Sequence, residues 1–371
     1  MPVPNRIPVA QPVFNGNEKK YVLDCLETGW ISSVGKYVES FEAKFASHTR
    51  AAHAFTCANG TCGLHLALLA LGVGPGDEVI VPSFTYIASA NAVTYCGARA
   101  VLADCDRETW TITPEEIARR MTPRTKGVMV VHLYGHPVDM DPILAICRAR
   151  GLFVLEDAAE AQGAAYKGHP VGAIGDVGVF SFFGNKIITT GEGGMIVTNR
   201  EDLGVKIKLL RNQGADPSRR YWHTILGFNY RMTNVQAAIG LAQLENLEWH
   251  LEERRRIAAS YGRHLERLGR WIEPPKVKSW ATHCFWMYVV TLSAAVAKHR
   301  DEVAAQLSEL GIETRPAFYP LHHLPPYQDR GLRLSVTESV AERALCLPTH
   351  AGLSESDIER VAAGLHHAVA T

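Results

Sequence analysis

The stretch Val179-Phe180-Ser181-Phe182-Phe183-Gly184-Asn185-Lys186 decides the fold, and Thr189-Thr190-Gly191-Glu192-Gly193-Gly194 follows closely after it. A run of β-type residues ends at a Gly-Asn turn and then presents a single lysine. Lys186 therefore stands where a buried strand should end and a loop should begin. A lysine that loses its hydration has a depressed pKa and becomes an amine nucleophile, although most lysines in turns are simply solvated.

Short apolar strands alternate with helical segments on both sides of this stretch. This alternation predicts an α/β fold, in which a mainly parallel, mixed sheet lies between helices. The expected strands cover residues 54–57, 78–82, 100–102, 127–132, 152–156, 178–183 and 194–197.

The second half of the chain has a different character. Residues 211–231 form a long irregular stretch rich in Arg, Gly and aromatic residues, which favours a functional loop. Residues 234–265 predict one long helix, and a small α+β unit follows it, with a helix expected over 340–345. We therefore predict a large domain over residues 1–250 and a smaller C-terminal α+β domain over residues 251–371.

The composition argues against several classes of protein. The 371 residues contain 38 Lys and Arg and 38 Asp and Glu, so neither nucleic acid nor an anionic membrane is expected as a partner. The eight cysteines form no CxxC pair and no zinc-spaced cluster, so we expect no metal site and a reducing, cytoplasmic location. We also expect no signal segment and no transmembrane helix.

Four features stand at the carboxyl ends of expected strands, where open parallel sheets bind ligands. Asn59-Gly60-Thr61 opens a helix and could hold an anion, or it is an ordinary N-cap. Tyr86 could stack on a planar ligand or pack in the core. Glu156-Asp157 closes an apolar strand, where a carboxylate needs a cationic or hydrogen-bonding partner or caps a helix. Ser181 and Lys186 form the fourth feature.

Together these four features fit one cofactor. A planar, phosphorylated, N-heterocyclic aldehyde needs a phosphate cradle, a stacking ring, a carboxylate at its ring nitrogen and an amine to hold its carbonyl. That description matches pyridoxal 5′-phosphate (PLP). A Rossmann dehydrogenase would need GxGxxG after its first strand and a P-loop NTPase would need GxxxxGK[ST], and the sequence has neither.

With these motifs the chain resembles the PLP-dependent nucleotide-sugar aminotransferases of the DegT/StrS type, a group of fold type I. The resemblance extends over nearly the whole chain and implies PLP as the cofactor. It also implies a homodimer, or a dimer of dimers, with shared active sites. The motifs that carry it are Asn59-Gly60-Thr61, PGDEVIVP (75–82), EDAAE (156–160), SFFGNK (181–186), GEGG (191–194), GFNYRM (227–232) and YPLH (319–322).

The resemblance implies the roles of the central residues. Lys186 matches the catalytic lysine that forms the Schiff base, and Asp157 matches the partner of the pyridine nitrogen. Glu160 stands beside the ring oxygen at a position where many relatives carry Gln. Some relatives that catalyse dehydration have His in place of the lysine, so the presence of Lys186 favours transamination.

The remaining cofactor contacts also follow from the resemblance. Gly60, Thr61 and Ser181 match residues that bind the phosphate within one subunit. Tyr86 matches the aromatic residue that stacks on the ring. Asn229 matches an asparagine that reaches the phosphate from the neighbouring subunit.

The implied reaction transfers the amino group of L-glutamate to C4 of a nucleotide-linked 4-keto-6-deoxy sugar. The expected acceptor is GDP-4-keto-6-deoxy-D-mannose, which implies a place in the biosynthesis of O-antigen lipopolysaccharide. The alternatives are a dTDP- or UDP-linked keto sugar aminated at C3 or C4, and a non-enzymatic regulator with the same fold.

Both substrates are anionic, and a guanidinium group binds a carboxylate or phosphate in a bidentate manner. Tyr319 and His322 could line the sugar pocket. For each of these residues an ordinary structural or surface role is an equal alternative. The candidate arginines lie in or near loops and are Arg211, Arg219, Arg220, Arg231 and Arg315.

Overall fold

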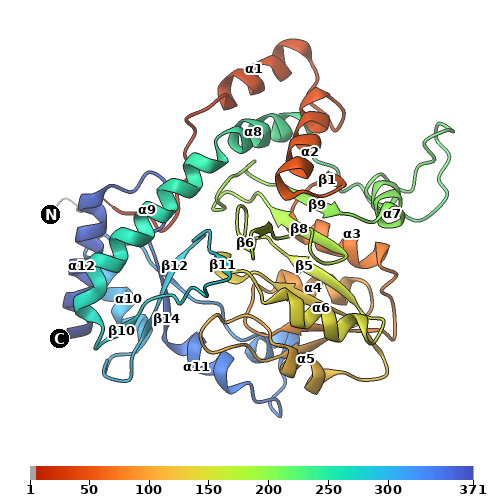
Figure 1. Cartoon of the computed structure of the whole chain (residues 1–371). Coiled ribbons are helices and arrows are strands. Elements are labelled where there is room, and N and C mark those ends of the chain that lie inside the picture. The colour runs from red at the N-terminus through yellow and green to blue at the C-terminus, as the bar shows by residue number, and fades with distance from the viewer. Residues whose placement is uncertain (1–5, 371) are drawn as a thin grey trace.

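A computed structural model describes residues 6–370, which form a seven-stranded sheet between helices and a smaller unit beside it (Figure 1). The strand order is β1-β9-β8-β5-β4-β2-β3. Both pairings of β9 are antiparallel and the other four are parallel, which confirms the predicted mixed sheet. The strands are β1 (His53–Cys57), β2 (Glu78–Pro82), β3 (Arg99–Ala103), β4 (Thr125–Val131), β5 (Phe153–Asp157), β8 (Val177–Ser181) and β9 (Gly194–Thr198).

Helices cover both faces of this sheet because successive side chains of a strand point to opposite faces. In β2, Val79 and Val81 pack into one core and Ile80 into the other. The first face is covered by α3, α4 and α7, and the second by α2, α5 and α6. Their bounds are α2 (Lys36–Thr49), α3 (Gly60–Ala70), α4 (Ala88–Tyr95), α5 (Pro114–Arg120), α6 (Met140–Arg148) and α7 (Glu201–Arg211).

The smaller unit is built on an antiparallel sheet with the order β10-β12-β14-β13. Its core also includes Ile7, whose N–H donates to Gly311 O at 2.9 Å. The elements are α9 (Leu247–Leu265), β10 (Ile272–Glu273), β12 (Tyr288–Leu292), α10 (Arg300–Glu309), β13 (Arg315–Pro316), α11 (Ser335–Arg343), β14 (Ala344–Leu347) and α12 (Glu355–Ala370).

Short elements connect these two parts. A three-stranded sheet has the order β11-β6-β7. In it, β11, which lies next to the small unit in the sequence, pairs with β6 of the large part. Its strands are β6 (Ala165–Tyr166), β7 (His169–Pro170) and β11 (Ala281–Thr282), and the 3₁₀ turns are η1 (Leu133–Gly135), η2 (Glu266–Leu268), η3 (Leu321–His323) and η4 (Pro325–Tyr327). Across residues 6–370, no helix is both long and apolar enough to cross a bilayer.

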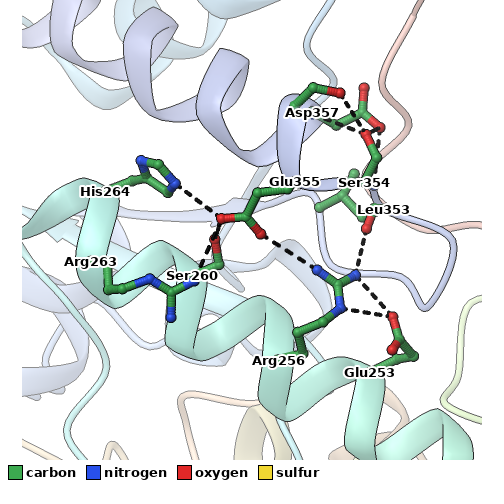
Figure 2. A network of polar contacts seen from close by, with 10 residues as sticks. Glu253, Arg256, Ser260, Arg263, His264, Leu353, Ser354, Glu355 and Asp357 are labelled. Carbon is green, nitrogen blue, oxygen red and sulfur yellow. Dashed lines mark hydrogen bonds and ion pairs between the residues drawn. The ribbon is translucent and has the colours of Figure 1, made fainter.

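Polar contacts join α9 to α12 inside the smaller unit (Figure 2). The Glu355 carboxylate accepts a hydrogen bond from Ser260 Oγ at 2.6 Å and lies 3.2 Å from His264 Nε2. Arg256 and Arg263 approach the same carboxylate at 3.6 and 3.5 Å. The charge of Glu355 is therefore balanced by two guanidinium groups.

Two predicted helices in the second half are wrong. The helix expected over 234–265 is broken at Asn246 (φ −107°, ψ 12°) into α8 (Asn234–Glu245) and α9. The helix expected over 340–345 ends at Arg343, because the next four residues form β14 in the small sheet. The N-terminal helix α1 (Glu18–Thr28) packs on α8.

The predicted domain boundary after residue 250 falls inside α9. Leu251 packs with the core of the large sheet, whereas Ile257 packs with the core of the small unit. The boundary itself stays a prediction.

Candidate active site

A pocket of about 400 Å³ lies at the edge of the large sheet where the carboxyl ends of the parallel strands meet. The four strand-end features singled out in the sequence all line it, and so do residues of the smaller unit, among them Trp286 and Arg315. The predicted cofactor residues in its wall are Gly60, Thr61, Tyr86, Asp157, Glu160, Ser181 and Lys186. The role of each residue stays a prediction, but their convergence in one pocket is a property of the fold.

Asp157 ends β5 with its carboxylate buried at the pocket floor. Ser89 Oγ donates to Oδ2 at 2.7 Å, and the Ala159 N–H donates to Oδ1 at 3.1 Å. Burial raises the pKa of Asp157, and these two hydrogen bonds and the charge of Lys186 act in the opposite direction. A buried carboxylate of this kind is stabilised by a cationic partner, such as a protonated ring nitrogen.

A buried hydrogen-bond network that includes Glu156 and His132 holds the end of β5 in place. His132 Nδ1 accepts from the Val138 N–H at 3.0 Å, so Nε2 carries the proton and donates to Glu156 Oε2 at 2.9 Å. The other oxygen of Glu156 accepts from the N–H groups of Ile174 and Gly175. This network fixes the strand that carries Asp157, so the position of the carboxylate does not depend on a loop.

Lys186 follows β8 and its side chain is almost fully buried. Its Nζ lies 3.8 Å from Glu160 Oε1 and 3.8 Å from the centre of the Trp286 ring. Burial lowers the pKa of Lys186, against the opposing charges of Glu160 and Asp157. The lowered pKa increases the fraction of molecules in which Lys186 is a neutral, nucleophilic amine at neutral pH.

Glu160 is buried between Lys186 and the backbone of η1. Its Oε2 accepts from the Tyr134 N–H at 2.8 Å. Burial raises the pKa of Glu160 to about 7, and the charge of Lys186 and the Tyr134 hydrogen bond oppose this rise. Glu160 therefore changes its protonation close to neutral pH, directly beside the lysine.

Aromatic rings from both units form one wall of the pocket. Tyr134 stacks on Phe318 with ring centres 5.3 Å apart, and on Trp286 at 6.0 Å. The indole N–H of Trp286 donates to Asn185 O at 2.8 Å. The residue before Lys186 is thus tied to the smaller unit, which limits where the lysine can point.

The phosphate cradle predicted from Asn59-Gly60-Thr61 lies at the start of α3. The Asn59 side chain caps the helix by accepting from the Cys62 N–H at 2.9 Å. A Cβ atom added at Gly60 would lie only 3.0 Å from the Cβ of Ser181. A side chain at Gly60 would therefore crowd Ser181 at the helix start, and an anion there would meet backbone N–H groups.

Tyr86 lies in the pocket wall with its side chain half exposed, and its ring centre is 5.9 Å from that of Phe318. An open aromatic face beside the pocket agrees with the predicted stacking role.

Seven predicted residues lie outside this pocket within the described chain. Arg211 donates to Glu42 Oε1 at 2.6 Å, and Arg220 donates to Tyr221 Oη at 3.0 Å. Arg219 lies over the Trp222 ring at 4.0 Å, and Arg231 donates to Ser33 Oγ at 2.9 Å. The remaining three are Asn229, which forms a backbone bridge with Asn212; Tyr319, which is half exposed beside Arg300; and His322, whose ring contacts Ser83 and Glu338.

The structure adds pocket residues that sequence reasoning did not select as cofactor contacts. Asn185 carries a buried side-chain oxygen without a partner in residues 6–370. Trp286 lies beyond the predicted domain boundary, and no local motif surrounds it. Arg315, one of several candidate arginines in the sequence, is the one of them that lines the pocket.

A second cavity, of about 510 Å³, lies at the opposite edge of the sheet. Two of its cationic side chains pair with carboxylates, Arg200 with Asp176 at 2.9 Å and Lys126 with Asp77 at 3.0 Å, and Lys206 donates to Ala70 O at 3.4 Å. The side chains of its Lys126 and Asp176 are 40% and 27% exposed, whereas Lys186 and Asp157 of the first pocket are buried, so the first pocket is the candidate active site.

The residues of the first pocket fit PLP. Lys186 offers an amine for the carbonyl, Asp157 a buried carboxylate for the ring nitrogen, and the start of α3 a cradle that a side chain at Gly60 would fill. The fold and this site define a PLP-dependent aminotransferase of fold type I.

The chain belongs to the DegT/DnrJ/EryC1/StrS aminotransferase family, whose sequence model matches residues 13–366. It is thus a PLP-dependent sugar aminotransferase. GDP-perosamine synthase of Caulobacter vibrioides is 55% identical over 361 residues, which cover 97% of each chain. GDP-perosamine synthase of Escherichia coli O157:H7 is 46% identical over 95% of each chain.

A solved structure of S. venezuelae DesV, in complex with a ketimine intermediate, superposes with a TM-score of 0.88. It is 35% identical to this chain and covers 95% of it, and the match spans 94% of DesV.

Proposed function

We propose that this aminotransferase moves the amino group of L-glutamate to C4 of GDP-4-keto-6-deoxy-D-mannose and so forms GDP-perosamine. The reaction type is supported by the buried Lys186, which shares one pocket with Asp157. The choice of sugar is supported by the 55% identity to a GDP-perosamine synthase over 97% of both chains.

The bound cofactor supplies an electron sink for the carbon that loses or gains a proton. Asp157 keeps the ring nitrogen protonated, because its buried carboxylate needs a positive partner. Lys186 Nζ, whose pKa is lowered by burial, takes the proton from the α-carbon of glutamate. In the second half of the reaction the same nitrogen would deliver the proton that C4 of the sugar gains. Glu160 lies within 3.8 Å and can exchange a proton with it.

Arg315 is the proposed partner for a carboxylate of glutamate. It lines the pocket, and the nearest carboxylate, that of Glu313, lies 4.0 Å away. A guanidinium this weakly engaged is free to bind a substrate carboxylate in a bidentate manner.

The proposal includes a homodimer, or a dimer of dimers, with shared active sites. Asn229 lies outside the pocket of its own chain, which agrees with a contact to the phosphate of a neighbouring subunit. Large apolar side chains are exposed on α1, on the segment after it and on the 212–231 loop, as expected of a surface that another subunit covers. They are Leu23, Leu26, Trp30, Ile31, Val34, Tyr221, Trp222, Ile225 and Leu226.

The proposed product would serve the biosynthesis of O-antigen lipopolysaccharide, and the proposed location is the cytoplasm. All eight cysteines are free, which agrees with a reducing compartment.

The sugar is tested by incubating the PLP-loaded enzyme and glutamate separately with GDP-, dTDP- and UDP-linked 4-keto-6-deoxy sugars. The products are identified by NMR, which shows both the nucleotide and the aminated carbon. We expect a GDP-linked 4-amino sugar as the main product. Amination of only the dTDP- or UDP-linked sugar would overturn the substrate, while the reaction type would stand.

A further inference from the structure

A cluster of three potential metal ligands lies outside the active-site pocket. His322 and His323 belong to η3, and Glu338 belongs to α11. Glu338 Oε1 is 3.0 Å from His322 Nε2 and 3.9 Å from His323 Nε2, and one ligating atom of each residue lies within 4.8 Å of the others. We propose that these three side chains bind a divalent transition-metal ion, with zinc as the best match.

The spacing of the ligating atoms agrees with zinc. Zn–N and Zn–O bonds of about 2.0–2.2 Å place tetrahedral ligands roughly 3.3–3.6 Å apart. The two spacings to Glu338, 3.0 and 3.9 Å, lie on either side of this range, so small rotations of the His323 and Glu338 side chains complete the site. Two imidazoles and one carboxylate are a common zinc ligand set that leaves a fourth position for water. Imidazole also disfavours magnesium and calcium.

Outer contacts orient the ligands. The Ser83 Oγ lies 2.8 Å from His322 Nδ1, the nitrogen that faces away from Glu338. A hydroxyl can donate or accept, so Ser83 Oγ can accept a hydrogen bond from Nδ1–H when Nε2 binds a metal. The Leu334 N–H donates to Glu338 Oε1 at 3.1 Å. Metal-binding histidines usually have such a partner on the second ring nitrogen.

The site is open on one side and anchored on the other. His322 is buried, whereas the side chain of His323 is 47% exposed, so an ion can enter from solvent. The Leu321 N–H donates to Ser83 O at 3.0 Å, just before the segment that carries Tyr86. A bound ion would therefore join η3 to α11 and support one wall of the pocket.

A second histidine–carboxylate pair shows what distinguishes this cluster. His264 lies 3.2 Å from Glu355, but Arg256 and Arg263 approach the same carboxylate (Figure 2). These two guanidinium groups would repel a metal ion. A His264→Asn variant is therefore a matched control, since it removes a histidine beside a glutamate on the same unit.

The test uses full-length, untagged, PLP-loaded protein that has been treated with a chelator. Zinc binding is measured by titration calorimetry, and cobalt replaces zinc to report the coordination by its absorption spectrum. We expect one ion per chain. His323→Asn should weaken binding at least about tenfold, and Ser83→Ala, which removes only an outer contact, by about 10–100-fold. His264→Asn should bind as the wild type does.

Thermal unfolding of each variant without zinc shows whether it is folded, and His323 is exposed enough for its replacement to be tolerated. Added zinc should raise the unfolding temperature of the wild type and of His264→Asn, and raise that of His323→Asn by clearly less. Absence of binding by the wild type would overturn the proposal. So would equal affinity of the wild type, His323→Asn and Glu338→Gln.

Discussion

At the residue scale, the chemistry of the pocket depends on how two buried groups share a proton. Lys186 and Glu160 lie 3.8 Å apart, and burial lowers the pKa of the lysine while raising that of the glutamate. Both shifts favour the neutral forms. Glu160 and Lys186 can therefore exchange a proton with each other during transamination.

Replacing Glu160 with Gln tests this pair through stability. The pKa of Glu160 rises from 4.5 to about 7 on folding, so between these pH values the folded chain holds a proton that the unfolded chain releases. Stability should therefore fall as the pH rises through this window. We expect the wild type to lose on the order of 2 kcal/mol relative to Glu160→Gln between pH 4.5 and 7. Urea unfolding of the cofactor-free proteins measures the difference.

The exposed Glu266→Gln serves as the control for this experiment. Parallel stability profiles for the wild type and Glu160→Gln would show that Glu160 does not titrate in the window.

Gly60→Ala tests the phosphate cradle. Its new Cβ would lie 3.0 Å from the Cβ of Ser181, so the start of α3 and the end of β8 must move apart. We expect PLP affinity to fall about tenfold or more, because misplaced backbone donors bind the phosphate poorly. Fluorescence titration with PLP measures it. The control is Gly74→Ala, whose Cβ would meet nothing within 4 Å, and it should bind PLP normally. If Gly60→Ala also bound PLP normally, the start of α3 would not be the phosphate cradle.

At the element scale, α3 couples helix stability to ligand binding. The Asn59 side chain caps its first turn, and Thr113 caps α5 in the same way by accepting from the Glu116 N–H. Only the α3 start lines the pocket. Removing either cap should reduce stability, but only removal of the α3 cap should also reduce PLP binding.

Asn59→Ala and Thr113→Ala should each lower the free energy of unfolding by about 1 kcal/mol. PLP affinity should fall for Asn59→Ala alone, since only that helix start offers its N–H groups to the phosphate. Chemical unfolding and PLP titration of both variants make the comparison. Equal PLP affinities would mean that the dipole and N–H groups of α3 do not contribute.

The sequence predicted the parallel strands and their functional ends because each carries a local signal. Lys186 follows a β-type run and a Gly-Asn turn, and Asp157 closes an apolar strand. The break at Asn246 was missed, because residues 234–265 contain helix-forming residues without a proline. Trp286 could not be placed, because its contact with Asn185 forms only when the small unit packs on the large one. The His322–Glu338 contact likewise appears only after folding.

At the scale of the whole molecule, the pocket lies between two units of one chain, and the proposed dimer adds a third contributor. Trp286 and Arg315 come from the smaller unit, while Lys186 and Asp157 come from the large sheet. Asn229 does not line the pocket of its own chain, and in the proposed dimer it contributes to the site of the other copy. The association of chains is therefore expected to be a condition for full activity.

Mixing two inactive variants tests this sharing. Lys186→Ala and Asn229→Ala each damage both sites of a symmetric dimer, but a mixed dimer has one site with both residues intact. After subunit exchange, an equal mixture should regain up to about a quarter of the wild-type activity. The rate of product formation measures the recovery, with each variant alone as its control. An exchanged mixture that stays as inactive as the variants would contradict a shared site.

The most direct test of the central claim is the visible absorption spectrum of the PLP-loaded protein before and after addition of glutamate. The account predicts a visible band that glutamate bleaches, because Lys186 holds the cofactor and then yields it to the amino donor. Lys186→Ala should lack this response, although it should still bind PLP through α3 and Asp157. A wild-type protein without a visible band in the presence of PLP, or a response that survives in Lys186→Ala, would contradict the assignment of Lys186 and with it the account.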